Sequence, residues 1–421
     1  MKKIVCDVAV IGGGPAGLAA AESAYENGAK KVILIERDKY LGGILQQCIH
    51  NGFGLHIMGE DKTGPEYAEY FIDKVKALPI ECLMETMVLE LSADLEIKAV
   101  NKTGTMQILP KAVVLAMGCR ERARGAIALP GKRVAGIMTA GTAQRFINIE
   151  GFLPGKKIVI LGSGDIGMIM ARRLHLEGAQ VLAVVEIMDC LGGLSRNLVQ
   201  CLQDFDIPLY LKHVITDVRG NKRVEGVDFA PLGDDNQPQL DKKISLDCDT
   251  LLLSVGLIPE NELSKQAGIM LDPVTRGPQV DQYFHTSTPG IFAAGNVAQV
   301  FDLVDHVSIC GINAGKSAAS YATDKLKHYS AKASTVKPGN GIATVLPQFL
   351  ANEANAEITF YLRAKKTLRK AVLKLCDSNG EVVFEKRLRT VRPAEMISFS
   401  IDNLKQTAEN YTFELTGDSH E

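Results

Sequence analysis

Three features that would place a chain of 421 residues in a familiar class are missing from this one. Its formal net charge is −2, so it lacks the basic surplus that broad binding to nucleic acid or to an anionic membrane requires. No apolar run approaches the roughly 18 residues of a membrane helix. Its nine cysteines include no Cys-x-x-Cys pair. This excludes a disulfide framework, a zinc site and an iron–sulfur cluster, because all three need clustered thiolates.

The same composition indicates the compartment and the size. Scattered cysteines are typical of a reducing environment, so we expect a cytoplasmic protein without a metal site. The start, Met1-Lys2-Lys3 before an apolar run, has the outline of a signal peptide. Because the run leads directly into a glycine turn, we interpret it as the first strand instead. Apolar content of 46% is ordinary for a chain with a sizeable core, and the length favours about two or three domains.

What the chain does have is one glycine pattern that occurs twice, 150 residues apart. The members are Gly12, Gly14 and Gly17, and then Gly162, Gly164 and Gly167. Each copy follows a short apolar run and opens a helix-like stretch. An acidic residue stands 19 positions after the third glycine of each copy, Glu36 in the first and Glu186 in the second.

This pattern is typical of dinucleotide binding. The first glycine makes a tight turn, the second lets the backbone approach a pyrophosphate, and the third lets the helix pack on the strand. The phosphates lie where free N–H groups and the helix dipole favour negative charge, and the distal carboxylate accepts hydrogen bonds from ribose hydroxyls. The chain is therefore predicted to bind two dinucleotides. The neighbours expected to share these contacts are Pro15, Ala16, Arg37, Asp165 and Ile166.

The strand and helix patterns predict an α/β fold with two Rossmann-like three-layer dinucleotide-binding domains, one inserted in the other. Apolar strands are expected at 113–118, 251–256 and 291–295, flanking the second turn, and a long alanine-rich helix at about 308–327. The expected domains are 1–122 with 250–329 for the first, and 123–249 for the inserted second.

The last part of the chain changes character. Residues 330–341 have linker composition, and 342–421 are expected to form a small all-β, sandwich-like domain. Asp377-Ser-Asn-Gly380 stands between two strand-like runs as a hairpin turn. A basic run among these strands is expected to be a solvated face: Arg363, Lys365, Lys366, Arg369 and Lys370.

With both turns, the runs Leu115–Gly118, Val255–Leu263 and Ile291–Val297 resemble the pyridine nucleotide–disulfide oxidoreductase superfamily over about residues 4–328. The resemblance implies FAD at the first turn and NAD(P)H at the second. It also implies that Gly43, Gly118, Gly256, Gly295 and Asn296 contact the cofactors. Asn296 stands where the superfamily usually has an aspartate, and an amide can still donate to phosphate and accept from a hydroxyl.

Within the superfamily, the run from Gly42 to Gly54 is similar to bacterial NAD/FAD-dependent dehydrogenases that accompany a glycerol-3-phosphate dehydrogenase. The resemblance therefore implies a partner dehydrogenase subunit of that kind. The redox disulfide of the superfamily is missing, because its usual place after Gly42-Gly43 offers only Cys48. The superfamily's C-terminal dimerisation domain is not recognisable in 340–421, so its dimer is not carried over and the oligomeric state stays open.

The second turn favours NADH over NADPH. Glu186 would bond a free ribose 2′-hydroxyl and repel a 2′-phosphate, whereas NADP sites tend to place an arginine nearby. Arg172 and Arg173 lie on the preceding helix rather than after the strand.

Three functions remain open at this point. The favoured one is an FAD-dependent NADH oxidoreductase that passes electrons to or from an acceptor or partner. The second is a single-cysteine NADH oxidase or peroxidase, in which Cys48 cycles through sulfenic acid. In either of these functions His50 is a candidate proton donor beside the flavin or substrate, or else a loop histidine bonded to backbone. The third is a non-catalytic assembly protein that binds FAD structurally and recruits a dehydrogenase.

Overall fold

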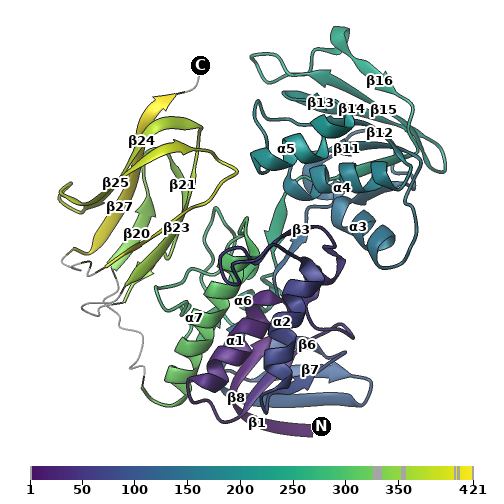
Figure 1. The fold of residues 1–421 in the computed structure, drawn as a ribbon. Helices are drawn as coiled ribbons and strands as arrows, with labels where there is room; N and C mark the ends of the chain where they lie inside the picture. The colour runs from purple at the N-terminus through teal and green to yellow at the C-terminus, as the bar shows by residue number, and fades with distance from the viewer. Residues whose placement is uncertain (1, 326–333, 352–356, 403, 405–407, 420–421) are drawn as a thin grey trace. The chain divides into compact units, whose positions relative to one another are not determined.

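The structure is a computed structural model that describes residues 2–325, 334–351, 357–402, 404 and 408–419. The chain divides into two compact units, the first Met1–Cys119 with Pro259–Glu421 and the second Arg120–Ile258. The mixed α/β architecture confirms the predicted fold class (Figure 1). None of the helices in the described ranges is long and apolar enough to cross a membrane.

The main sheet of the first unit has seven strands in the order β5-β2-β1-β8-β7-β6, with β19 paired to β8. Its strands are β1 (Lys2–Ile11), β2 (Val32–Ile35), β5 (Glu81–Leu83), β6 (Met87–Leu91), β7 (Ile97–Asn101), β8 (Gly104–Leu115) and β19 (Ile291–Ala293). β1 runs parallel to β2 and β8, so the carboxyl ends of these strands meet at one edge. That edge carries the first glycine turn.

Helices cover this sheet. They are α1 (Pro15–Glu26), α2 (Gly64–Lys76) and α7 (Val304–Ala322), with the short α6 (Glu262–Gln266) nearby. α1 packs against both α2 and α7 (Figure 1). Smaller elements connect them: β3 (Asn51–Phe53), β4 (Lys62–Thr63), and the 3₁₀ turns η1 (Gly43–Gln47) and η5 (Gly295–Val297).

The second unit has three layers around a parallel sheet in the order β10-β17-β11-β12-β13. Alternate residues of β11 face opposite layers, as the period of a strand requires. Ile158 and Ile160 pack with the helices, whereas Val159 and Leu161 pack with an antiparallel sheet of β14, β15 and β16. The strands are β10 (Ile137–Thr139), β11 (Lys157–Leu161), β12 (Gln180–Val185), β13 (Leu209–Tyr210), β14 (His213–Gly220), β15 (Val224–Pro231), β16 (Ile244–Leu246) and β17 (Thr250–Leu253). The helical elements are α3 (Ala140–Asn148), α4 (Asp165–Leu176), α5 (Ser195–Cys201), η2 (Arg124–Ile127), η3 (Gln203–Phe205) and η4 (Leu240–Lys242).

One expected boundary is corrected by this sheet. The strand at 251–256 is expected in the first domain, but β17 lies between β10 and β11 inside the sheet of the second unit. The chain returns to the first unit after β17, where β18 (Leu257–Pro259) pairs with β9 (Cys119–Glu121). The division therefore falls at 119/120 and 258/259.

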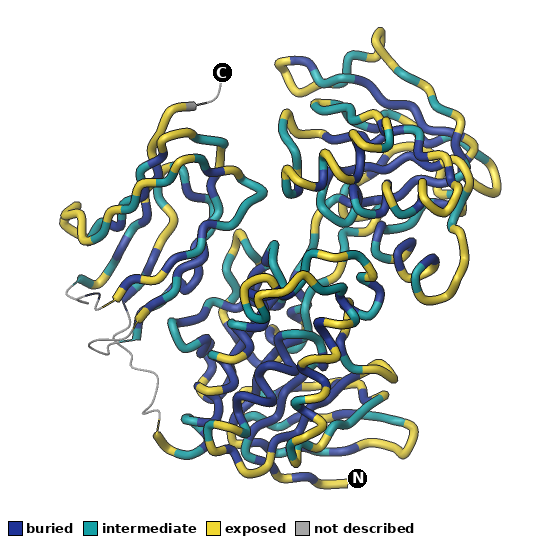
Figure 2. The backbone as a smooth tube through the Cα atoms, viewed as in Figure 1, coloured by how far each residue is buried: buried dark blue, intermediate teal, exposed yellow. Residues whose placement is uncertain are grey.

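The C-terminal segment folds as two facing β-sheets with a core of their own, which we call the β-domain (residues 334–419). One sheet has the order β22-β20-β27-β24-β25 and the other β21-β23-β26. The strands are β20 (Ser334–Pro338), β21 (Ile342–Leu346), β22 (Phe349–Leu350), β23 (Ile358–Ala364), β24 (Leu368–Asp377), β25 (Val382–Val391), β26 (Ile397–Ile401) and β27 (Asn410–Ser419). Figure 2 shows that buried residues follow the strands of both units and of the β-domain.

Two expectations near this domain also change. Part of the segment with linker composition, 330–341, forms strand β20, and its residues 330–333 lie outside the described residues. The helix expected to begin near 308 begins at Val304 and ends at Ala322. The expected hairpin turn at Asp377–Gly380 does connect β24 to β25.

Candidate functional site

The first glycine turn links β1 to α1 and has no room for side chains at two of its positions. Gly12 has φ +107°, and a Cβ there would lie 2.4 Å from the Ala116 carbonyl oxygen. A Cβ on Gly17 would lie 1.7 Å from the Gly12 oxygen. Gly14 is different, because a Cβ on it would meet nothing within 4 Å. The turn is therefore tightly packed at Gly12 and Gly17, whereas the space beside Gly14 is open.

The open side of this turn faces a helix start that suits an anion. Gly14 is the N-cap of α1 and supplies no side-chain cap, and Pro15 occupies the first turn. The N-terminal N–H groups of a helix need partners, and the helix dipole favours negative charge there. An uncapped start beside free space fits a pyrophosphate.

Glu36 ends β2 beside this turn and is 7% exposed. Its Oε2 accepts a hydrogen bond from Gly13 N at 2.6 Å, and its Oε1 accepts one from Asp38 N at 2.7 Å. These bonds fix the carboxylate, and each oxygen keeps a further lone pair for a ribose hydroxyl. Arg37, the next residue, is exposed.

The Gly42-Gly43 loop lies against the same turn. Gly42 N donates to Gly13 O at 2.8 Å, and a Cβ on Gly43 would lie 3.0 Å from Gly14 Cα. Cys48 follows in this loop, where its Sγ donates to Ile44 O at 3.3 Å. Gly64 N, at the start of α2, donates to Cys48 O at 2.8 Å. The structure thus places Cys48 at a helix start.

His50 is the second candidate catalytic residue of this loop. Its Nδ1 lies 2.9 Å from Asn51 O, and its ring is 5.0 Å from that of Phe53. Both contacts orient the imidazole within the loop.

Gly295 and Asn296 are far from the first turn in the sequence, but Gly295 lies against the start of α1. A Cβ on Gly295 would lie 2.9 Å from Ala16 Cβ. Asn296 accepts a hydrogen bond from Phe301 N at 3.0 Å through Oδ1, and its Nδ2 donates to the Cys119 sulfur at 3.6 Å. Gly118 has φ +71° and open space around it. The structure therefore brings Gly295 to the start of α1.

Sequence reasoning missed two glycines that make this meeting possible. Gly311 and Gly315 are four residues apart on α7, and a Cβ on either would lie 2.2 Å from a carbonyl oxygen of α1, that of Ala16 or Ala20. Their spacing places them on one helix face. That spacing was the available signal for a close contact between α1 and α7.

The start of α7 gathers buried polar groups. Asp305 is 2% exposed and accepts from Ile57 N at 3.1 Å. The His306 ring stacks on His56 at 6.0 Å, and its Nδ1 is buried without a hydrogen-bond partner. Burial, and then the neighbouring His56, lower the pKa of His306. Ser308 is a structural partner of the Tyr67 hydroxyl, at 2.9 Å.

The second turn, in the other unit, repeats the first with one addition. Gly162 has φ +98°, and a Cβ there would lie 2.1 Å from Ser254 O. Glu186, 6% exposed, accepts from Ser163 N and from Ser163 Oγ, both at 2.7 Å, through Oε2. Its Oε1 accepts from Met188 N at 2.9 Å. The carboxylate is thus held as Glu36 is, with a serine hydroxyl added.

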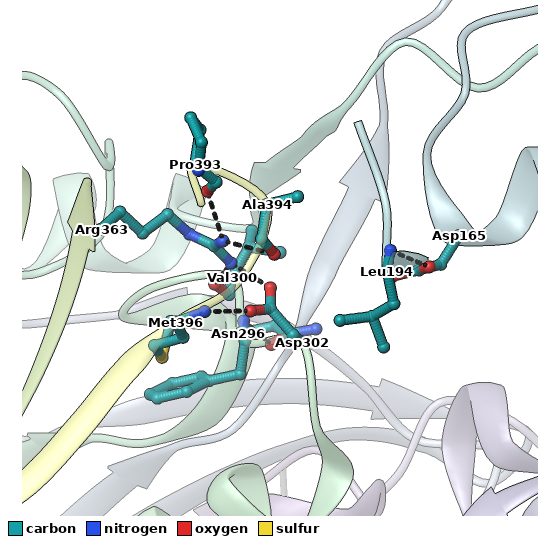
Figure 3. A network of polar contacts seen from close by, with 10 residues as sticks. Asp165, Leu194, Asn296, Val300, Asp302, Arg363, Pro393, Ala394 and Met396 are labelled. Carbon is teal, nitrogen blue, oxygen red and sulfur yellow. Dashed lines mark hydrogen bonds and ion pairs between the residues drawn. The ribbon is translucent and has the colours of Figure 1, made fainter. Parts of the chain in front are cut away.

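The helix start of the second turn is the place where the two copies differ most. Asp165 replaces Pro15 at the first position of α4, and its Oδ1 accepts from Leu194 N at 2.8 Å (Figure 3). The same oxygen accepts from Asn197 Nδ2 at 2.6 Å. Asp165 therefore holds the Gly192-Gly193 loop across the turn. Ile166 is half-buried beside it, and Gly256 has φ +97°.

The comparisons with known proteins agree with this geometry. Residues 6–311 match the family model described as pyridine nucleotide-disulphide oxidoreductase. The chain is 25% identical over 317 residues to the HcnB subunit of hydrogen cyanide synthase from Pseudomonas protegens, covering 69% of this chain and 66% of that protein. It is 29% identical over 321 residues to an opine oxidase subunit of Agrobacterium tumefaciens, covering 70% and 61% respectively. The chain thus spans less than two thirds of these relatives.

Solved structures show the same fold. The thioredoxin reductase of T. acidophilum superposes with a TM-score of 0.61 at 23% identity, over 75% of this chain and 98% of that one. The thioredoxin reductase of Lactococcus lactis gives 0.62 at 21% identity, over 76% and 99%. Because the family model spans most of the chain, this protein belongs to the pyridine nucleotide–disulphide oxidoreductase family.

Proposed function

We propose that this protein is an NADH-dependent flavoprotein that exchanges electrons between NAD(H) and a partner dehydrogenase subunit. The observation that carries the proposal is the repeated turn, in which Glu36 and Glu186 make matching hydrogen bonds at positions 150 residues apart. One turn per unit gives one dinucleotide per unit. FAD is assigned to the first turn and NADH to the second.

For FAD, the chain supplies binding and orientation. The pyrophosphate is held at the uncapped start of α1 beside Gly14, and the adenosine ribose by Glu36. Gly43, Gly118, Gly295 and Asn296 line the continuation of the site. The chemistry that bound FAD supplies is acceptance of a hydride from NADH and onward transfer of the electrons.

For NADH, the selective group is Glu186. Its fixed carboxylate accepts from a ribose 2′-hydroxyl and repels a 2′-phosphate. The residues that follow, Ile187 to Leu191, include no arginine or lysine. Ile187 and Met188 line a cavity of about 640 Å³ that offers mainly apolar walls, which suits an adenine ring.

The partner is inferred from the relatives. Two of them are named as subunits, of opine oxidase and of hydrogen cyanide synthase. We propose that this chain likewise works as one subunit, with a glycerol-3-phosphate dehydrogenase-like partner.

The direct test is to mix the FAD-loaded protein with NADH without oxygen and to follow flavin absorbance. We expect rapid bleaching by NADH and much slower bleaching by NADPH. An unchanged spectrum with NADH would overturn the proposal for the isolated chain and favour a structural flavin in an assembly protein.

A Cys48→Ser variant separates the relay from cysteine-based peroxide chemistry. Because the Cys48 thiol already bonds Ile44 O within its own loop, we expect the variant to keep NADH-dependent flavin reduction. Loss of peroxide-dependent NADH oxidation in the variant, when the parent shows it, would instead assign the peroxidase function.

A further inference from the structure

The β-domain contributes side chains to a core that is not its own. Leu346 on β21 and Tyr361 on β23 are opposite each other in the strand pair and belong to the hydrophobic core of the α/β part of the unit. Their neighbours Val345 and Leu362 belong to the core of the β-domain. Successive side chains of a strand point to opposite faces, so these two strands serve both cores.

Arg363, the second residue after Tyr361, anchors the segment that follows the Gly295-Asn296 motif. Its Nη2 forms an ion pair with Asp302 and donates to Val300 O at 3.2 Å (Figure 3). Its Nη1 donates to Pro393 O and Ala394 O, both at 3.2 Å. The guanidinium fork thus joins segment 300–302 to a loop of the β-domain.

The Asp302 carboxylate receives a second donor from the β-domain. Met396 N donates to its Oδ2 at 2.7 Å, while Arg363 holds Oδ1 (Figure 3). The side chains of Arg363 and Asp302 are 21% and 13% exposed. Removing one partner of such a shielded pair leaves the other charge without compensation.

Tyr361 reaches the same segment by a second path. Its ring stands edge-on to Phe301, with centroids 5.1 Å apart. Its hydroxyl interacts with the thiol of Cys310 on α7, as does the backbone of Gly295. Phe301 N in turn donates to Asn296 Oδ1. Tyr361 therefore contacts Phe301, which holds Asn296, and Arg363 holds Val300 and Asp302 on either side of Phe301.

We propose that Arg363, supported by Tyr361, is a positioning residue of the flavin site, and that the β-domain helps to form that site by holding the Gly295–Asp302 segment. The inference rests on the proposed function, in which Gly295 and Asn296 hold FAD. The β-domain fixes the Gly295–Asp302 segment at its far end, and the segment presents its near end to the cofactor. Lysine cannot replace the fork, because one ammonium does not reproduce the spread of the guanidinium donors.

The test uses the full-length FAD-loaded protein and four variants. Arg363→Met removes the anchor, Arg363→Lys retains the charge, and Tyr361→Phe removes only the hydroxyl. Arg369→Met is the matched control, because Arg369 is an exposed arginine of the same domain. The measurements are the rate of FAD release, the visible circular dichroism of bound flavin, its midpoint potential, and the melting temperature of the FAD-free protein.

We expect Arg363→Met to release FAD about tenfold faster and to alter the flavin dichroism, with Arg363→Lys intermediate and Arg369→Met unchanged. Tyr361→Phe should alter the dichroism with a smaller change in release. If the variants only melt earlier, with the release rate, dichroism and potential of the parent, the positioning role is wrong. If Arg363→Met does not fold, the Arg363→Lys and Tyr361→Phe results decide. A parent protein that holds no FAD would defeat the proposed function itself, which is a distinguishable outcome.

Discussion

The two glycine turns have the same sequence pattern but differ at the third glycine and in the segments that cover them. At the first glycine the second turn is the tighter one, with 2.1 Å at Gly162 against 2.4 Å at Gly12. A Cβ on Gly17 would lie 1.7 Å from the Gly12 oxygen, whereas one on Gly167 would lie 2.8 Å from the Gly162 oxygen. Helix α7 also packs closely against the first turn, where Gly311 lies against the backbone of Ala16. The second is covered by a loop and the start of α5, from which Asp165 accepts two hydrogen bonds.

This difference teaches how one motif serves two kinds of ligand. Close packing at the third glycine and against α7 holds the start of α1 in one place, which suits a cofactor that stays bound. A polar contact between a helix start and a loop exchanges more readily than backbone packing, which suits a nucleotide that enters and leaves at each turnover. We interpret the first turn as the resident site and the second as the exchange site.

The largest expected effect is that of alanine at the third glycine. Gly17→Ala should abolish FAD incorporation and unfold the first unit, because the backbone must shift to admit a Cβ at 1.7 Å. Gly167→Ala, the matched variant, should keep FAD and weaken NADH binding only several-fold. FAD content and circular dichroism check both. Equal damage from the two substitutions would remove the contrast in packing.

The next effect concerns the response of each unit to acid. Burial lowers the pKa of His285 in the first unit to about 4, and its Nε2 accepts from Gly290 N at 3.0 Å. The unfolded pKa is about 6.5, so between these values the unfolded chain binds more protons and stability falls as pH falls. The expected loss is up to about 3 kcal/mol. The histidines of the second unit, His175 and His213, are exposed and half-buried.

Hydrogen exchange of each unit between pH 7 and pH 4.5 measures this effect. The first unit should lose more protection than the second. A His285→Gln variant, which cannot titrate, should start less stable at pH 7 but show a flatter pH dependence. The same slope in parent and variant would show that other groups cause the acid sensitivity.

Smaller effects on nucleotide binding are expected at Glu186 and Glu36, each confined to its own turn. Glu186→Gln should raise the Kd of NADH about thirtyfold, equivalent to about 2 kcal/mol, because its charge-assisted hydrogen bonds are weakened. FAD content should stay at the level of the parent. Glu36→Gln should do the opposite, losing FAD while NADH affinity persists. Calorimetric titration measures the NADH affinity of the two variants, and their FAD content is measured beside it. A variant that lowers both NADH affinity and FAD content would show that the sites are not separate.

The smallest effect is expected at Asp165. Asp165→Asn keeps an acceptor for Leu194 N but removes a negative charge beside the helix start. NADH should bind about fivefold tighter, a gain of about 1 kcal/mol from reduced repulsion of the pyrophosphate. Titration with NADH at low salt measures it. Weaker binding would mean that the charge itself is needed to hold the loop.

Sequence reasoning located the turns because their requirements are local. Positive φ and close backbone approach leave only glycine at Gly12 and Gly162, so the pattern and the structure coincide there. The strand expected at 251–256 is assigned to the wrong unit because its first residues, Leu251-Leu252-Leu253, are all apolar. Such a run predicts a buried strand but not which sheet holds it. The start of α7 was missed because its N-cap, Leu303, supplies no side-chain capping signal.

Arg363 marks the limit of that reasoning. In the sequence it stands in a basic run expected to be a solvated face. The structure corrects this, because Arg363 pairs with Asp302, which lies 61 residues earlier in the chain. Neither residue carries a local sign of the other. The link between the β-domain and the Gly295-Asn296 segment therefore emerges only in three dimensions.

The most direct test of two dissimilar sites is a count of bound nucleotides. The purified protein should retain one FAD and no NAD(H) per chain after extensive desalting. It should then bind one NAD+ per chain in a calorimetric titration without releasing FAD. Two retained FAD molecules per chain, or displacement of FAD by NAD+, would contradict the assignment of a resident site to the first turn and an exchange site to the second.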